Sequence, residues 1–161
     1  MSAYITLYIK RTEDNYYIEL DSWSRSSKMF RYLSDLVSYE SCREVNADTL
    51  DVAIEIAKGD KAKCVEARDR QVETMNFCSS ISVTTAEALR ELIEQRENYK
   101  NSIEEFNSEI EEIENAISQL VTYYSIAENI SNEWRSKSIA NLYLAYEMDP
   151  NNQDENEEKE N

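Results

Sequence analysis

The sequence predicts an α+β fold that is predominantly helical: an N-terminal β-hairpin packed on short helices, then a long antiparallel helical hairpin or coiled coil. Three observations predict it. Residues 3–10 alternate apolar and polar side chains with period two, as a half-buried strand does. Residues 84–148 contain no glycine or proline, and their apolar residues recur at alternating steps of three and four. The whole chain of 161 residues has one glycine and one proline, so turn-forming residues are few.

The first element is a β-hairpin predicted over residues 3–20. Aliphatic side chains fill one face of its first strand, and Tyr4 and Tyr8 share the opposite face. Residues 12–15 supply turn chemistry, and the alternation resumes over residues 16–20. Because two strands alone are marginally stable in water, another element must cover the aliphatic face. The tyrosine face is then either a second covered face or an exposed candidate contact surface.

Short helices are predicted next, over about residues 28–39, 48–58 and 60–78, where the apolar spacing is helical. Gly59 suits the left-handed residue that ends the second of these helices. Residues 42–45 form either a loop or a third short strand. The predicted N-caps are side chains that can accept a backbone N–H, namely Ser26 or Ser27 for the first helix and Asp48 for the second.

A long helix is predicted to begin near Thr85, because Thr84 with Glu87 is a capping-box signature. Unbroken to Ala127, it would be roughly 65 Å long at 1.5 Å per residue. A bend or turn is expected near residues 129–133, before a further helical segment that ends at Asp149-Pro150. The predicted domains are an N-terminal α+β module (1–83), a helical or coiled-coil region (84–148) and a disordered acidic tail (149–161).

The long helix carries an apolar seam. Its heptad positions e and g are largely neutral, whereas a parallel two-stranded zipper usually has opposite charges there. The seam therefore favours an antiparallel hairpin, with residues 60–78 and 133–148 of the same chain as partners. Homodimerisation through the same seam is the alternative. The seam residues are Leu92, Tyr99, Ile103, Phe106, Ile110, Ile113, Ile117, Leu120 and Tyr124.

The net charge is −16, from 33 acidic and 17 basic residues. Part of the negative charge is predicted to form an acidic ridge on the outer face of the long helix. Such a ridge can imitate a nucleic-acid backbone and occupy a basic groove of a nucleic-acid-binding protein, or it can be a solvated surface. Direct binding of nucleic acid by this part of the chain is not expected. The ridge residues are Glu97, Glu104, Glu105, Glu111 and Glu112.

A second candidate site is a small-anion site in the loop before the first helix, where hydroxyls, backbone N–H groups and cations come together. Ordinary helix capping with surface charge is the alternative. Trp23, in the same loop, is expected to be a packing anchor, with an exposed binding residue as the alternative. The residues of the candidate anion site are Ser24, Arg25, Ser26, Ser27, Lys28 and Arg31.

Catalytic signals are weak. The chain has no histidine, and its three cysteines lack metal-ligand spacing, so we expect reduced thiols, no cofactor and no metal site. A single disulfide such as Cys64–Cys78 is the alternative to three reduced thiols. No phosphate-binding glycine loop or nucleophile elbow occurs. No apolar run is long enough to span a bilayer, and no secretory signal opens the sequence. We therefore expect a cytoplasmic protein that does not bind a membrane.

Small size, acidity, abundant tyrosine and the absence of enzyme motifs resemble, in composition alone, accessory proteins of phages and mobile elements, including anti-restriction and anti-CRISPR inhibitors. The sequence thus predicts a non-enzymatic acidic protein–protein interaction module whose partner has a basic surface. Its sharper form is an inhibitor of a nucleic-acid-binding host defence protein. The alternatives are a homo-oligomeric coiled-coil scaffold or adaptor, and a binder of small anionic ligands.

Overall fold

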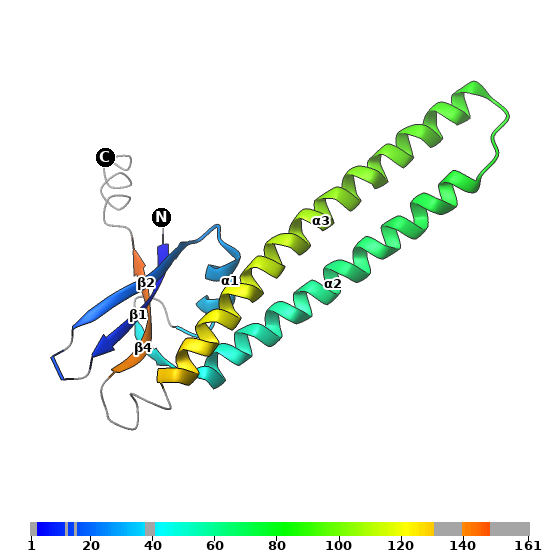
Figure 1. Ribbon diagram of the computed structural model, residues 1–161. Helices are drawn as coiled ribbons and strands as arrows, with labels where there is room; N and C mark the ends of the chain where they lie inside the picture. Colours follow the sequence, from blue (N-terminus) through cyan, green and yellow to red (C-terminus); the bar gives the residue numbers. More distant parts are fainter. Residues whose placement is uncertain (1–2, 12, 15, 38–40, 131–139, 149–161) are drawn as a thin grey trace, which may run out of the picture. The chain divides into compact units, whose positions relative to one another are not determined.

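A computed structural model of the protein describes residues 3–11, 13–14, 16–37, 41–130 and 140–148. The predicted α+β, mainly helical class is confirmed (Figure 1). The elements, in chain order, are β1 (Ala3–Arg11), β2 (Tyr17–Ser24), α1 (Lys28–Ser34), β3 (Cys42–Val45), α2 (Ala47–Ser80), α3 (Ala86–Asn129) and β4 (Ala140–Met148).

The chain forms two compact units: a sheet unit, residues 1–57 with 116–161, and a hairpin unit, residues 58–115. Each long helix contributes to both units, because α2 passes residue 57 and α3 passes residue 115. Residue 83, the domain boundary predicted from the sequence, lies in the connection between α2 and α3. The predicted acidic tail, residues 149–161, lies outside the described residues.

The sheet unit contains a four-stranded antiparallel sheet with strand order β2-β1-β4-β3. The predicted N-terminal hairpin is confirmed as β1 and β2, and the short segment at residues 42–45 is a strand, β3. In β1, Ile5 and Leu7 are at most 1% exposed, whereas the alternate residues are less deeply buried or face outward. The period-two pattern therefore identified the strand and its core face correctly.

Strand β4 corrects the prediction of a helix over residues 133–148. Leu142, Leu144 and Tyr146 lie opposite Ile9, Leu7 and Ile5 of β1. In the sequence, apolar residues in this segment fit both a period of two and a helical period, so the pattern is ambiguous. The strand forms because β1 has a second edge whose backbone groups need partners, and β4 supplies them over nine residue pairs. Trp134 and Ile139 lie outside the described residues.

Helix α2 corrects the prediction of two helices separated at Gly59. It runs without a break through Gly59, whose backbone is not left-handed. Buried Ala53 and Ala57 on one side of the glycine, and half-buried Cys64 on the other, continue one packed stripe. That packing offsets the roughly 1 kcal/mol cost of a glycine inside a helix.

Two helix starts also differ from expectation by one or two residues. The backbone N–H of Thr49 donates to Oδ1 of Asn46 over 2.9 Å, so Asn46 takes the capping place expected for Asp48. Similarly, the N–H of Ala88 donates to Oγ1 of Thr85 over 3.1 Å, in place of the expected Thr84. Ser27 caps α1 as predicted, but that helix ends at Ser34 rather than near residue 39.

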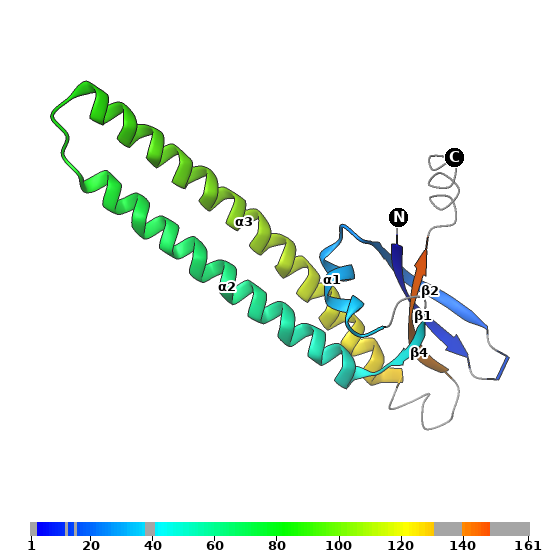
Figure 2. The ribbon, with the colours of Figure 1, turned by 180° about the vertical axis from the view of Figure 1, so that it is seen from behind.

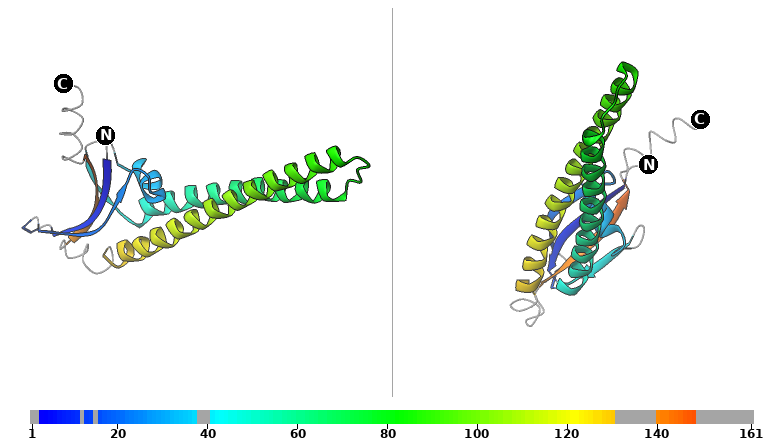
Figure 3. Two further views of the ribbon diagram at one scale, coloured as in Figure 1. Left: turned by 90° about the horizontal axis from the view of Figure 1, so that it is seen from above. Right: turned by 90° about the vertical axis from the view of Figure 1, so that its right-hand side faces the viewer.

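The core of the sheet unit lies on one face of the sheet, which α1 and the adjoining segments of α2 and α3 cover (Figure 3). Trp23 of β2 belongs to this core and is 7% exposed, as expected for a packing anchor. Its indole N–H donates to Oε1 of Gln119 over 3.2 Å, and its ring meets Tyr123 edge to face at 5.6 Å. Leu120 of α3 and Leu144 of β4 are fully buried in the same cluster.

In the hairpin unit, its segments of α2 and α3 run side by side in opposite directions (Figures 1 and 2). Nζ of Lys61 lies 3.1 Å from Oε1 of Glu114, and the Arg68 guanidinium donates to Oδ1 of Asn107 over 3.1 Å. The antiparallel helical hairpin predicted from the neutral e and g rows is thus present, with α2 as the partner of α3.

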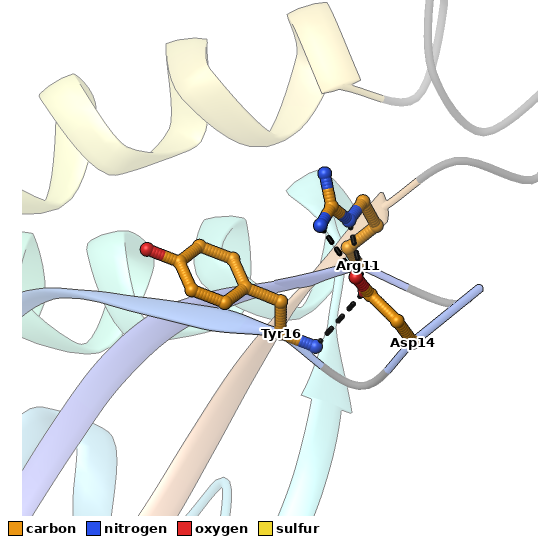
Figure 4. A network of polar contacts seen from close by, with 3 residues as sticks. All are labelled: Arg11, Asp14 and Tyr16. Atoms are coloured by element: carbon orange, nitrogen blue, oxygen red, sulfur yellow. Dashed lines mark hydrogen bonds and ion pairs between the residues drawn. The ribbon is translucent and has the colours of Figure 1, made fainter.

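The turn between β1 and β2 is closed by a polar clasp (Figure 4). The Arg11 guanidinium donates to both carboxylate oxygens of Asp14, and the backbone N–H of Tyr16 donates to Oδ1 of Asp14 over 3.2 Å. The Arg11 guanidinium also lies 5.3 Å from the centre of the Tyr16 ring. Hydrogen bonds from Arg11 lower the pKa of Asp14 to about 2, so this turn holds an ionised carboxylate at neutral pH.

Candidate functional surfaces

The apolar seam of α3 is used within the chain. Ile110 and Ile113 are 6% and 1% exposed in the hairpin unit, and Leu120 is fully buried in the sheet unit. The seam residues nearer the start of α3 are half-buried, as are two nearer its end; these are Leu92, Tyr99, Ile103, Phe106, Ile117 and Tyr124. The chain itself therefore buries the deepest part of the seam, and homodimerisation through the rest of it stays a prediction.

The acidic ridge lies on the solvent side of α3. All five of its glutamates are exposed, and the described part of the chain offers none of them an ion pair. Residues 101–129 contain seven glutamates and no lysine or arginine. A hollow of about 510 Å³ on this face is lined by Asn101, Glu104, Glu105, Ser108, Glu109 and Glu112. The five ridge glutamates can therefore attract cationic groups without first breaking an ion pair of their own.

The end of the hairpin unit near residues 81–85, which we call the hairpin tip, exposes large apolar side chains. Phe77 is 66% exposed, Ile81 41%, Leu89 48% and Ile93 58%. They are four of the ten large apolar side chains that are exposed among the described residues. Ile93 also lines a hollow of about 250 Å³ together with Met75, Arg96, Glu97 and Lys100. Apolar side chains thus adjoin the first ridge residue, Glu97, and two cations on one stretch of α3.

The spacing of the seam residues also runs through Leu89, with Ile93 next to Leu92, but this spacing did not predict that the hairpin tip is exposed. The apolar spacing indicates that a residue faces the partner helix, but it does not show how far the partner extends. Here α2 ends at Ser80, so the first turns of α3 have less to pack against. The break in helical pattern at residues 81–83 was the available signal.

The loop proposed as an anion site uses several of its groups internally. Oγ of Ser24 lies 3.1 Å from Oγ of Ser26, and Oγ of Ser27 accepts from the N–H of Met29. The guanidinium of Arg31 lies 5.9 Å from the centre of the Tyr32 ring, while Arg25 is exposed. The hydroxyls therefore serve capping and loop closure, and anion binding here stays a prediction.

Comparison of the chain with protein-family models, curated proteins and solved structures gave no match. No described helix combines the length and the apolarity needed to cross a membrane. Among the described side chains, no group of three or more cysteines, aspartates or glutamates is placed to hold a metal ion.

Proposed function

We propose that this chain is a non-enzymatic protein–protein interaction module that binds a partner with a basic surface. The proposal is supported most by one observation in the hairpin unit: exposed apolar side chains at the hairpin tip adjoin the exposed acidic ridge. Protein interfaces commonly combine buried apolar anchors with a charged rim that sets orientation and partner choice. The hairpin tip supplies the anchors, and the ridge supplies the charge.

The sharper form of the proposal is inhibition of a nucleic-acid-binding protein. Glu97, Glu104 and Glu111 recur every seven residues and stand roughly 10 Å apart along one helix. A rigid helix that carries such a row could occupy a groove built for phosphates and compete with nucleic acid. The part of the chain with the ridge is strongly acidic, which fits a competitor of nucleic acid better than a ligand of it.

The homo-oligomeric scaffold remains an alternative, with a different surface used for self-association. Because the chain itself buries the deepest part of the seam, self-association could instead use exposed apolar side chains such as those of the hairpin tip. Ile93→Asp should then dissolve an oligomer without disturbing the core, since Ile93 is 58% exposed. Ile110→Asp is unsuitable for this purpose, because Ile110 is buried and the change would unfold the hairpin.

The decisive experiment starts from the full-length chain, with which the partner is captured in the native host and identified by mass spectrometry. Calorimetry then compares the wild type with the double variant Glu104→Lys, Glu111→Lys. Each lost pair is worth up to about 1 kcal/mol, so the variant should bind up to about 30-fold more weakly. If the partner binds nucleic acid, the wild type should also displace that nucleic acid.

The matched control is Asp51→Lys with Glu73→Lys, which changes the net charge equally at exposed positions of α2. It should bind within about twofold of the wild type, because it leaves the ridge intact. If both double variants weakened partner binding equally, the effect would come from net charge and not from the ridge. Unchanged binding by the ridge variant, with its helicity preserved, would exclude the ridge as the binding surface.

A further inference from the structure

The outer face of the sheet, opposite the core of the sheet unit, carries a second surface with its own chemistry. Antiparallel pairing places Tyr8 of β1 beside Tyr143 of β4 and Glu19 of β2, all on this face. The helical segments of the unit lie on the other side of the sheet (Figure 3).

A hollow forms on this face where the ladder is irregular. The β1–β2 register shifts between Leu7 and Tyr8, so Leu20 is an extra residue in β2. The hollow has a volume of about 660 Å³, within the range of small-ligand sites. It is lined by Thr6, Tyr8, Lys10, Tyr17, Glu19, Ser22 and Glu147.

Aromatic rings held in place form one wall of the hollow. The Tyr8 ring lies 5.5 Å from Tyr17, tilted by 58°, and stacks on Tyr143 at 5.9 Å and 17°. The Tyr8 hydroxyl is 2.7 Å from Sγ of Cys42, which anchors the ring from β3. Burial and the contact with Cys42 raise the pKa of the Tyr8 hydroxyl, so this hydroxyl keeps its proton above the pH at which an ordinary tyrosine ionises. Tyr17 is 65% exposed, so part of its surface is open to a ligand.

The charge of the hollow favours a cation. Its lining contains two exposed carboxylates, Glu19 and Glu147, and one ammonium, that of Lys10. Nζ of Lys10 lies 5.4 Å from the centre of the Tyr143 ring, so this face already holds one cation against an aromatic surface. Thr6 and Ser22, whose hydroxyl oxygens are 3.1 Å apart, add acceptors. An anion would meet the two carboxylates unfavourably.

We propose that this hollow binds the guanidinium group of an arginine side chain from a partner polypeptide. A guanidinium is planar, so it can stack on Tyr17 while its N–H groups donate to Glu19, two residues along β2 on the same face. A lysine ammonium fits less well, because it is more strongly hydrated and cannot stack. The volume of the hollow leaves room for the flanking peptide backbone. This inference concerns the sheet unit and does not depend on the hairpin surface.

The test is an NMR titration of the ¹⁵N-labelled full-length protein with acetyl-Gly-Arg-Gly-amide. Saturable shifts are expected for amides of β1, β2 and β4 around the hollow. Acetyl-Gly-Lys-Gly-amide should bind at least about threefold more weakly, and the glutamine and glutamate analogues should give no saturable shifts. Equal binding of the lysine peptide would overturn the assignment to guanidinium, and equal binding of the glutamine peptide would overturn the site.

Variants with opposite expected signs make the test sharper. Glu19→Gln and Tyr17→Leu should each weaken arginine-peptide binding about threefold or more, while Lys10→Gln should strengthen it by removing a competing cation. Tyr16→Leu is the matched control, because Tyr16 is also exposed but lies outside the hollow. Unchanged thermal unfolding would show that each variant is folded. Weaker binding by Lys10→Gln, or equal losses from Tyr16→Leu and Tyr17→Leu, would refute the proposal.

Discussion

Gly59→Ala tests the continuity of α2 through the sign of its effect. Gly59 lies inside the helix, is exposed, and has no heavy atom within 4 Å of an added Cβ. Alanine is favoured over glycine in an exposed helix interior by about 0.8–1.0 kcal/mol, partly because glycine gives the unfolded chain more freedom. With no clash to offset that gain, we expect the free energy of unfolding to rise by about 0.8–1.0 kcal/mol.

The assay is urea unfolding of the full chain, followed by circular dichroism at 222 nm. The midpoint should move to higher urea with an unchanged slope, because the surface exposed on unfolding stays the same. In a thermal scan, a change of about 1 kcal/mol corresponds to a rise in Tm of about 2–4 °C for a chain of this size.

Ala62→Gly is the matched control, since Ala62 is an exposed residue in the same helix. It should lower the free energy of unfolding by about the amount that Gly59→Ala raises it. If Gly59 instead ended a helix in the left-handed conformation, alanine there would cost about 1–2 kcal/mol. A destabilised Gly59→Ala protein would therefore refute the continuous helix.

Three further predictions concern the sheet unit. Leu144→Ala should lower the free energy of unfolding in urea by about 2–5 kcal/mol, because Leu144 is fully buried in β4; a loss below about 1 kcal/mol would contradict that placement. The Tyr123 hydroxyl donates to Asp21 over 2.9 Å, and burial followed by this bond raises the pKa of Tyr123 to about 12. The contribution of this hydrogen bond to the free energy of unfolding should be full below pH 10 and lost as pH rises through about 12. Tyr123→Phe should remove this pH dependence from the free energy of unfolding. Hydrogen bonds from Arg11 are the chief cause that lowers the Asp14 pKa to about 2. The stabilisation that the clasp contributes should therefore be full above pH 3.8 and lost as pH falls through about 2. Arg11→Gln should return the Asp14 pKa toward its ordinary value in a carboxyl NMR titration, and no change would contradict the clasp.

Local patterns in the sequence determined those elements whose neighbours are close in the chain. The alternation of residues 3–10 identified β1, its core face and its hairpin with β2. The steps of three and four identified α3 and its buried seam, and the neutral flanks of the seam indicated an antiparallel partner. The exposure of the acidic ridge followed from the same periodicity, because residues opposite a buried seam face water.

Only the tertiary structure decided which distant segments pair. Residues 140–148 fit two periods, and they form β4 because the free edge of β1, more than 130 residues earlier, needs backbone partners. Gly59 looks like a helix end in isolation, yet packing on both sides of it carries α2 onward. The outer sheet hollow joins Tyr8, Tyr17 and Glu147 from three strands. Residue patterns record which face of an element is buried, whereas the partner that buries it is set by long-range contacts that no short window of sequence contains.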